Sequence, residues 1–372
     1  MRQKSVLSVL MVGGILCLAL MVCFLSLGTV QAKGKVIELK CANFFPPPSK
    51  QSKVCEEFIN DLEARTDGRI KVQYFAGGSL LKGPAMYKGI ETGIVDMGYS
   101  HVFYTPGRMP VTELASLPLG YQSAWVASHV LNDFYYKVQP KEWDNVKLLW
   151  LNGCPPCIIL STKPVRNLED LKGLSLRAPS VAGDIVKALG GTPSPTPMAE
   201  TYDAIAKGVN DGGYLVYECL KTWRLAEVVD YATICWQMGN TYPFYMAMNK
   251  NSYKNLPPDL KGIFDKLVGE YMVRSTLMWN QIDLGGKNFG TQKGVEYIEL
   301  SEQEAARWKK AVEPVIDGCI KRMVGKGFKE SDLNSWIAFL QERIGYYTKK
   351  QIEYRIPSAT GSAEMRPENI GK

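Results

Sequence analysis

Apolar residues are spaced first like a strand, then like a helix, then like a strand again at the start of the charged part of the chain. Residues 35–42 and 69–75 alternate between apolar and polar side chains, which predicts two strands. Residues 49–65, between them, have apolar side chains at intervals of four, which predicts a helix. These apolar side chains are Val54, Phe58 and Leu62. Strands alternating with helices over short connections are typical of a mainly parallel sheet, so the predicted fold class is α/β.

Segments of the same two kinds continue along the chain. The further predicted helices cover residues 83–93, 124–138, 181–189, 197–207 and 260–290. The further predicted strands cover residues 95–99, 146–151, 158–161, 173–178 and 242–249. We expect two lobes joined by crossing strands, with a ligand cleft between the lobes and a long helix bracing both. The predicted division is a signal peptide at 1–32, the first lobe at 33–153 and 244–285, and the second lobe at 154–243 and 286–372, which ends in helices and a tail.

The N-terminus carries an export signal. Basic residues in positions 1–4 precede an uncharged apolar stretch, residues 5–30, and cleavage is predicted after Ala32. The apolar stretch is also long enough to span a bilayer, so an uncleaved N-terminal anchor stays open as an alternative. Cys17 and Cys23 lack the small preceding residue expected beside a lipid-modified cysteine. We therefore expect a soluble, exported mature protein.

Composition and charge exclude one class of partner. The chain has 372 residues, 46% of them apolar, with 44 basic against 37 acidic residues. Removal of residues 1–32 takes away two positive charges and leaves a formal charge of +5. The basic residues are mixed with acidic ones and are not gathered with aromatic residues into a stripe, so nothing indicates nucleic-acid binding.

Catalytic motifs are lacking in the sequence. His101 and His129 are the only histidines, which disfavours a Ser-His-Asp triad or a site with two histidine ligands to a metal. The chain contains no Gly-x-Ser-x-Gly elbow, phosphate loop, Gly-x-Gly-x-x-Gly fingerprint or His-Glu-x-x-His motif. We expect no enzyme activity, no cofactor and no metal.

Seven cysteines follow the predicted signal, so at least one has no partner within the chain. Cys154 and Cys157 enclose two prolines and form the obvious local pair, either as a structural disulfide or as quiet thiols. A redox dithiol normally begins a helix, whereas the residues after Cys157 predict a strand. No second Cys-x-x-Cys supplies the other half of a zinc site, so redox and metal chemistry are disfavoured.

A single arginine stands at the end of a predicted strand. Arg177 follows residues 173–176 and precedes Ala178-Pro179. A guanidinium presents parallel N–H donors that match both oxygens of a carboxylate, so Arg177 is a candidate for gripping an organic acid. A structural salt bridge is the alternative reading. Aromatic residues that either line the cleft or belong to the core are Tyr99, Phe103, Tyr104, Tyr214, Tyr217, Trp236, Tyr242 and Phe244.

Several motifs together resemble one family of proteins. They are Ala76-Gly-Gly-Ser-Leu80, residues 89–98 (Gly-Ile-Glu-Thr-Gly-Ile-Val-Asp-Met-Gly), Leu117-Pro-Leu119, residues 163–179, residues 202–212 and Leu256-Pro-Pro-Asp-Leu260. The chain resembles the extracytoplasmic solute-binding subunits of tripartite ATP-independent periplasmic (TRAP) transporters, of the DctP type. The resemblance implies a periplasmic-binding-protein fold, capture of an organic acid, and delivery to the permease subunits in the membrane. It also implies that Arg177 forms the salt bridge to the ligand carboxylate.

Two departures from the family pattern narrow the range of expected ligands. Many members place a second arginine where this chain has residues 154–157, and many carry Glu-Asn or Glu-Trp where it has Tyr214-Leu215. Without these groups a second carboxylate or a set of sugar hydroxyls has no partner, and burying such groups is costly. The interpretation is a monocarboxylate with an apolar or aromatic body, bound by Arg177 with Tyr99, Phe103, Tyr104, Tyr214, Tyr217 and Trp236. A C4-dicarboxylate ligand and a sensing subunit with the same fold stay open.

Overall fold

The structure is a computed structural model that describes residues 35–370. The predicted signal peptide, residues 1–32, lies outside the described residues. From Glu38 onward the chain forms one compact unit. Between residues 35 and 370, no helix has both the length and the apolar character that crossing a bilayer requires.

A five-stranded sheet forms the centre of the first lobe. In spatial order its strands are β2 (Ile70–Phe75), β1 (Ile37–Asn43), β3 (Met97–His101), β10 (Pro243–Asn249) and β4 (Val146–Gly153). β1 and β3 are parallel, whereas β10 is antiparallel to both of its neighbours. The chain therefore returns from the second lobe through β10, which lies between β3 and β4, two strands that come much earlier in the sequence. The helices of this lobe are α2 (Lys50–Arg65), α3 (Met86–Glu91), α4 (Pro110–Leu114), α5 (Ala124–Val138) and α9 (Lys250–Lys254).

Helix α2 shows how local sequence and packing agree in this lobe. Its N-cap is Ser49, whose hydroxyl accepts a hydrogen bond from the backbone N–H of Ser52 at 3.1 Å. Phe58 is fully buried and meets the rings of Trp150 and Tyr271 edge-on, at centroid distances of 5.6 and 5.3 Å. The predicted apolar stripe of this helix therefore packs into the core between the sheet and α10.

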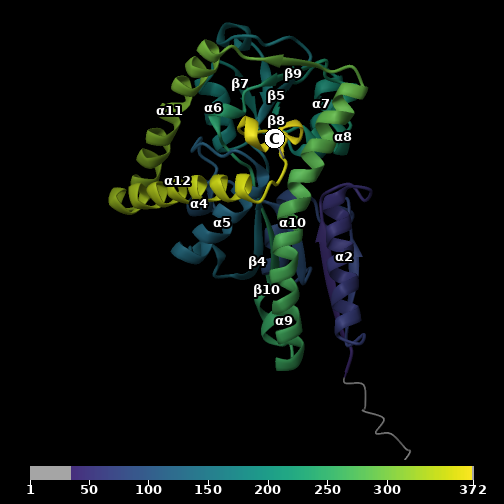
Figure 1. Cartoon of the computed structure of the whole chain (residues 1–372). Coiled ribbons are helices and arrows are strands. Elements are labelled where there is room, and N and C mark those ends of the chain that lie inside the picture. Colours follow the sequence, from purple (N-terminus) through teal and green to yellow (C-terminus); the bar gives the residue numbers. More distant parts are fainter. Residues whose placement is uncertain (1–34, 371–372) are drawn as a thin grey trace, which may run out of the picture. The chain divides into compact units, whose positions relative to one another are not determined.

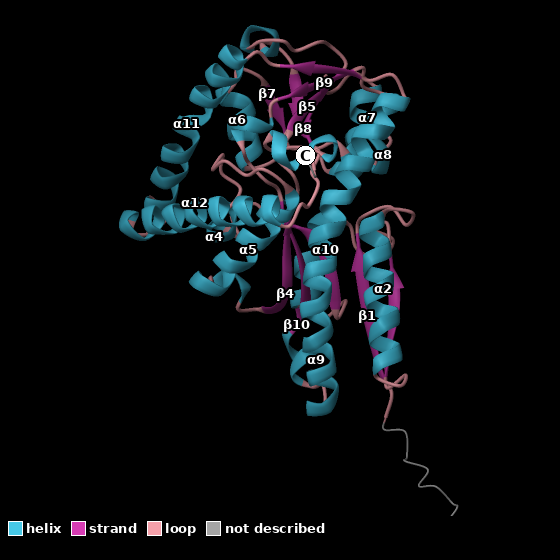
Figure 2. Cartoon of the chain, viewed as in Figure 1, coloured by secondary structure: helices cyan, strands magenta, loops and turns pink. Residues whose placement is uncertain are grey.

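The second lobe contains a six-stranded sheet. Its strands, in spatial order, are β11 (Glu296–Glu299), β9 (Tyr231–Ile234), β5 (Ile158–Ser161), β8 (Gly212–Leu215), β6 (Ser175–Arg177) and β7 (Thr192–Ser194). In Figure 2 the strands labelled β5, β7, β8 and β9 lie together in this lobe. Its helices are α6 (Val181–Ala188), α7 (Met198–Ala206), α8 (Glu218–Thr222) and α11 (Glu302–Val324). The predicted two-lobed α/β fold is confirmed.

The long helix α10 (Pro258–Gln292, 35 residues) contacts both lobes. It packs on α2, α5 and β4 of the first lobe and on α8 of the second (Figure 1). Gly286 allows the close approach to α8, because a Cβ there would lie 2.2 Å from the carbonyl oxygen of Tyr217. The last helix, α12 (Glu330–Glu353), packs on α5 and so carries the C-terminal segment back to the first lobe.

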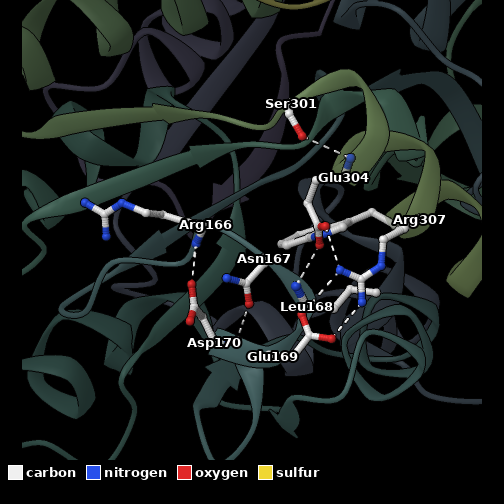
Figure 3. Close-up of polar contacts among 9 residues, drawn as sticks. Arg166, Asn167, Leu168, Glu169, Asp170, Ser301, Glu304 and Arg307 are labelled. Atoms are coloured by element: carbon white, nitrogen blue, oxygen red, sulfur yellow. Dashed lines mark hydrogen bonds and ion pairs between the residues drawn. The ribbon is translucent and has the colours of Figure 1, made fainter.

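A polar network fixes the segment that leads into strand β6. Asn167 caps the short helix Leu168–Leu171 by accepting a hydrogen bond from the N–H of Asp170. The carboxylate of Glu304, on α11, accepts from the N–H of Leu168 at 2.8 Å (Figure 3). Arg307 donates to both Glu304 and Glu169, at 2.7 and 2.6 Å. Helix α11 therefore holds the turn that precedes Arg177.

Replacing Glu304 by alanine is expected to destabilise the protein. Glu304 is only 8% exposed, and the Nε1–H of Trp308 is its third partner at 2.9 Å. Its loss leaves buried donors unpaired, which costs roughly 2–3 kcal/mol and lowers Tm by several degrees. Thermal unfolding followed by circular dichroism measures the effect. The matched control is Glu302→Ala, an exposed glutamate in the same helical turn, and an equal Tm for both variants would contradict the network's role.

Candidate functional site

Residues of both lobes surround a cavity of about 30 Å³. Its walls are almost entirely aromatic and aliphatic, with Arg177, His101 and Glu218 as the groups that can titrate or carry charge, besides thiols and phenols. The lining residues are Phe44, Phe45, His101, Tyr104, Phe244 and Trp279 from the first lobe and α10, and Cys154, Arg177, Met198, Leu215, Val216, Glu218, Cys219, Trp223 and Tyr242 from the second lobe and its connections. This volume holds about one or two water molecules, so a larger guest requires the walls to move apart.

Arg177 is a buried cation without an acidic partner. Its side chain is 1% exposed, and its Nε–H donates to the carbonyl oxygen of Thr196 at 3.0 Å. The guanidinium carbon lies 5.9 Å from the ring centroid of Tyr242, within cation–π range. Across residues 35–370, no carboxylate forms an ion pair with Arg177. A buried guanidinium without a counter-charge costs free energy of folding, and an anion that binds beside it offsets this cost.

The position of Arg177 follows from the sheet. Arg177 is the last residue of β6, beside Ser194 of β7 and Gly213 of β8. Parallel strands direct their carboxyl ends to the same edge, where ligands of open α/β sheets bind. Gly213 leaves room for Leu215 and Arg177, because a Cβ there would lie 2.6 Å from the side chain of Leu215 and 3.3 Å from the Cβ of Arg177.

His101 supplies a second donor to the cavity. Its Nδ1 accepts a hydrogen bond from the N–H of Phe103 at 3.0 Å, so the proton of the neutral ring resides on Nε2. Burial, and then the nearby charge of Arg177, hold the pKa of His101 well below its usual value. Nε2 is buried and has no partner. The imidazole therefore presents an unused N–H donor close to the guanidinium.

Side-chain hydrogen bonds connect the two lobes at the cavity and at a separate pocket lined by Glu113 and Ser180. The hydroxyl of Tyr104 accepts from the N–H of Met198 at 3.1 Å. Gln51 Nε2 donates to Glu218 Oε2 at 3.4 Å. At a third point the hydroxyl of Ser180, three residues after Arg177, donates to Glu113 Oε2 at 2.7 Å. Each of these contacts depends on the lobes standing close together.

Two of the seven predicted site residues, Arg177 and Tyr104, line this cavity. Tyr99 lies deeper in the first lobe, where its hydroxyl donates to Asn152 and accepts from Trp279 at 3.0 and 2.8 Å. Phe103 stands behind the lining, 4.9 Å from the ring of His101. The remaining three predicted residues also lie outside the lining, in contact with other parts of the fold.

Tyr214, Tyr217 and Trp236 each have another partner. Tyr214 donates to Asn240 Oδ1 at 2.5 Å, on the face of β8 opposite Leu215. The ring of Tyr217 lies 5.8 Å from that of Tyr297, and the ring of Trp236 lies 5.8 Å from the guanidinium of Arg366. Eleven of the fifteen lining residues were not predicted to bind the ligand or line the cleft. Aromatic type alone could have suggested four of them: Phe44, Phe45, Trp223 and Trp279. His101 and Glu218 are the two that carry an imidazole or a carboxyl.

Cys154 and Cys157 are free, buried thiols in the structure. Cys154 lines the cavity, and its Sγ accepts from the N–H of Tyr242 at 3.2 Å. Burial, and then the neighbouring Cys157, raise the pKa of the Cys154 thiol well above its usual value, which disfavours a reactive thiolate. In the described part of the chain, no three His, Cys, Asp or Glu side chains are grouped so as to hold a metal ion.

Comparisons with known proteins identify the relatives of this chain. Residues 42–322 match the family described as bacterial extracellular solute-binding protein, family 7, or DctP. A solved TRAP periplasmic solute-binding protein from Desulfovibrio salexigens is 33% identical, with a TM-score of 0.72, over 84% of this chain and 97% of that one. It is described as an open complex with the C-terminus of a symmetry mate in its ligand-binding site.

Two further relatives have described ligands. A TRAP solute-binding protein from a marine metagenome, specific for aromatic acids and solved with 3-hydroxybenzoate, is 25% identical, with a TM-score of 0.79, over 84% of this chain and 99% of that one. The C4-dicarboxylate-binding periplasmic protein DctP of Rhodobacter capsulatus is 25% identical over 79% of this chain and 90% of its own length.

The buried carboxyl of Glu113 is expected to make stability depend on pH. Burial raises the pKa of Glu113 to about 7, and its Oε1 has no partner. The folded state therefore favours the protonated carboxyl, so this residue's contribution is full below about pH 4.3 and is lost as pH rises through 7. The carboxyl also faces Glu142, Lys326 and Arg322. We expect Glu113→Gln to gain Tm relative to the unmodified protein between pH 5 and 8.

Thermal unfolding of both proteins at half-unit pH steps measures this difference. Asp283, whose pKa burial raises to about 8, contributes a decline of the same sign in both proteins and cancels in the comparison. Parallel curves would show that Glu113 does not titrate in this range.

Proposed function

The chain belongs to family 7 of the bacterial extracellular solute-binding proteins, and we propose that it captures a monocarboxylate with an aromatic or other apolar body for a TRAP-type transporter. On this proposal the two lobes close around the acid, and the loaded protein delivers it to the permease subunits in the membrane. The protein acts outside the cytoplasm as a carrier and does not transform its ligand.

The observation that carries the proposal is the buried guanidinium of Arg177, which faces the cavity without an ion pair across residues 35–370. A carboxylate can accept two parallel N–H donors from it, and the unused Nε2–H of His101 offers one more. The anion supplies the charge that the fold leaves uncompensated. The guanidinium of Arg177 then provides both the binding free energy and the specificity for acids.

One cation favours one carboxylate. Arg177 is the only arginine or lysine among the described lining residues, and the rest of the wall is mainly aromatic and aliphatic. A second carboxylate would be buried without a counter-charge, which costs several kcal/mol. This supports a monocarboxylate over a C4-dicarboxylate, even though the Rhodobacter capsulatus relative is described as a dicarboxylate binder.

The aromatic wall supports an aromatic or apolar body. The rings of Phe44 and Trp223 are nearly parallel, 6.1 Å apart with an interplanar angle of 19°. Phe244 and Trp279 stack at 4.6 Å. Flat walls of this kind favour a flat guest, because offset stacking adds to the free energy of apolar burial. The metagenome relative, described as specific for aromatic acids, supports the same reading.

Ligand binding is expected to stabilise the closed arrangement of the two lobes. The bonds from Met198 to Tyr104, from Gln51 to Glu218 and from Ser180 to Glu113 form only when the lobes meet. A ligand that contacts Arg177 of one lobe and His101 of the other adds a fourth connection. Ligand binding therefore shifts the population toward the closed form, which a permease can distinguish from the open form.

Replacing Arg177 by alanine is expected to abolish acid binding. Truncating a buried charge partner typically costs 2–5 kcal/mol, so affinity for benzoate should fall by at least about thirtyfold. Arg177→Lys should retain only part of the affinity for the acid, because an ammonium lacks the parallel N–H donors of a guanidinium. Isothermal titration calorimetry with a panel of aromatic acids, aliphatic acids and sugars measures the change. Arg166→Ala is the control, since Arg166 is an exposed arginine of the same lobe; unchanged affinity in Arg177→Ala would refute the proposal.

Replacing His101 by phenylalanine is expected to weaken acid binding by about tenfold. Phenylalanine keeps the ring contacts with Phe244 and Phe103 but removes the Nε2–H donor, and one hydrogen bond to a charged group contributes about 1.5–3 kcal/mol. His101→Gln keeps an amide donor and should lose less. Titrations with the same acids compare the two variants, and equal affinities would show that Nε2 does not touch the ligand.

A further inference from the structure

We propose that Glu218 receives a hydroxyl group on the ligand, so that the preferred ligands are hydroxylated aromatic monocarboxylates. This inference rests on the proposed function and adds a second recognition point to the same cavity. Glu218 lines the cavity together with Arg177, but the two side chains form no ion pair with each other in the described structure. Their surroundings differ: Arg177 contacts Thr196 and Tyr242, whereas Glu218 contacts Gln51 and α10.

The carboxyl of Glu218 has hydrogen-bonding capacity to spare. The residue begins helix α8 directly after β8 and is 3% exposed. Gln51 Nε2 donates to its Oε2 at 3.4 Å, and the thiol of Cys219 donates to its Oε1 at 3.5 Å; the side chain of Thr222 is a third partner of the carboxyl. Both distances are at the long end for a hydrogen bond, and a carboxyl group offers about four acceptor positions. A ligand group that enters the cavity can therefore make a shorter contact.

A second buried acid lies behind Glu218 and fixes its backbone. Asp283 of α10 is 1% exposed, and its Oδ1 accepts from the N–H of Glu218 at 3.1 Å. Its Oδ2 is buried without a partner. No lysine or arginine forms an ion pair with either carboxyl in the described residues, and burial raises the pKa of both. Burial therefore disfavours the charged form of both carboxyls.

The carboxyl of Glu218 restricts the chemistry of the guest. A carboxyl accepts a hydrogen bond from a hydroxyl in either protonation state, and when protonated it also donates one, so the two groups are complementary. A second carboxylate would face the carboxyl of Glu218, with Asp283 buried behind it and no ion pair from lysine or arginine to either group in the described residues. An ammonium carries three donors, and the neighbouring side chains Phe44, Phe45 and Trp279 offer it no acceptor. A hydroxyl is the group that this end of the cavity accommodates.

Ligands that differ by one hydroxyl test the inference. We expect 3-hydroxybenzoate or 4-hydroxybenzoate to bind the unmodified protein at least tenfold more tightly than benzoate, measured by calorimetry at pH 7. In Glu218→Leu the ratio of the dissociation constant of benzoate to that of the hydroxybenzoate should fall to near one. In Glu218→Gln, which keeps a hydrogen-bond donor and an acceptor, most of the preference for the hydroxybenzoate should persist. Glu200→Leu, which replaces an exposed glutamate of the same lobe, should leave the ratio unchanged.

The outcomes separate the two proposals. A hydroxyl preference that survives in Glu218→Leu, or a preference for 3-(aminomethyl)benzoate over 3-hydroxybenzoate, overturns the role of Glu218 while acid capture stands. Absence of binding to any aromatic acid, or binding that is insensitive to Arg177→Ala, refutes the proposed function instead. Glu218→Met provides the same reading if the leucine variant does not fold, and the Tm of each unliganded variant establishes folding.

Discussion

The buried charge of Arg177 is the constraint around which this molecule is organised. A guanidinium that is 1% exposed and lacks a carboxylate partner in the described chain is an unstable arrangement unless the fold pays for it elsewhere. The carbonyl oxygen of Thr196 and the face of Tyr242 compensate part of the cost. The side chain of Tyr104 also interacts with the guanidinium, which faces the cavity where an anion can reach it. The need for a counter-ion is therefore built into the fold and is met when the ligand arrives.

The architecture supports this charge by holding two independent sheets around it. Arg177 lies at the carboxyl end of strand β6 in the second sheet, and His101 lies at the carboxyl end of β3 in the first. Helix α10 packs on elements of both lobes and carries Trp279 to the cavity and Asp283 to the backbone of Glu218. Hydrogen bonds between the lobes lie at the cavity, at a separate pocket lined by Glu113 and Ser180, and at the carbonyl of Gly239, which accepts from the N–H groups of Gly120 and Tyr121. Such an arrangement allows the lobes to separate at little cost and to close when a ligand adds its own contacts.

The guanidinium of Arg177 is the one lysine or arginine charge in the described cavity wall. Burial lowers the pKa of His101 and raises the pKa of Glu218, so it disfavours the charged form of both. One positive charge among aromatic rings suits a guest with one negative charge and a flat apolar body. The carboxyl of Glu218 and the imidazole of His101 can then form hydrogen bonds with polar groups on that body.

The sequence by itself determined the fold class, the division into two lobes and the arginine at the end of β6, because these depend on local periodicity and on residue type. It did not determine which aromatic residues meet the ligand. Tyr99 shares a strand face with His101 but lies two residues further from the sheet edge, and Tyr214 points to the face of β8 opposite Leu215. A period of two shows that side chains alternate, but it does not show which face or which end of a strand borders the cleft. Only the packing of β3 and α10 against the second lobe, which contains α8 and β6, decided that His101, Trp279 and Glu218 share one cavity with Arg177, since these residues are far apart in the chain.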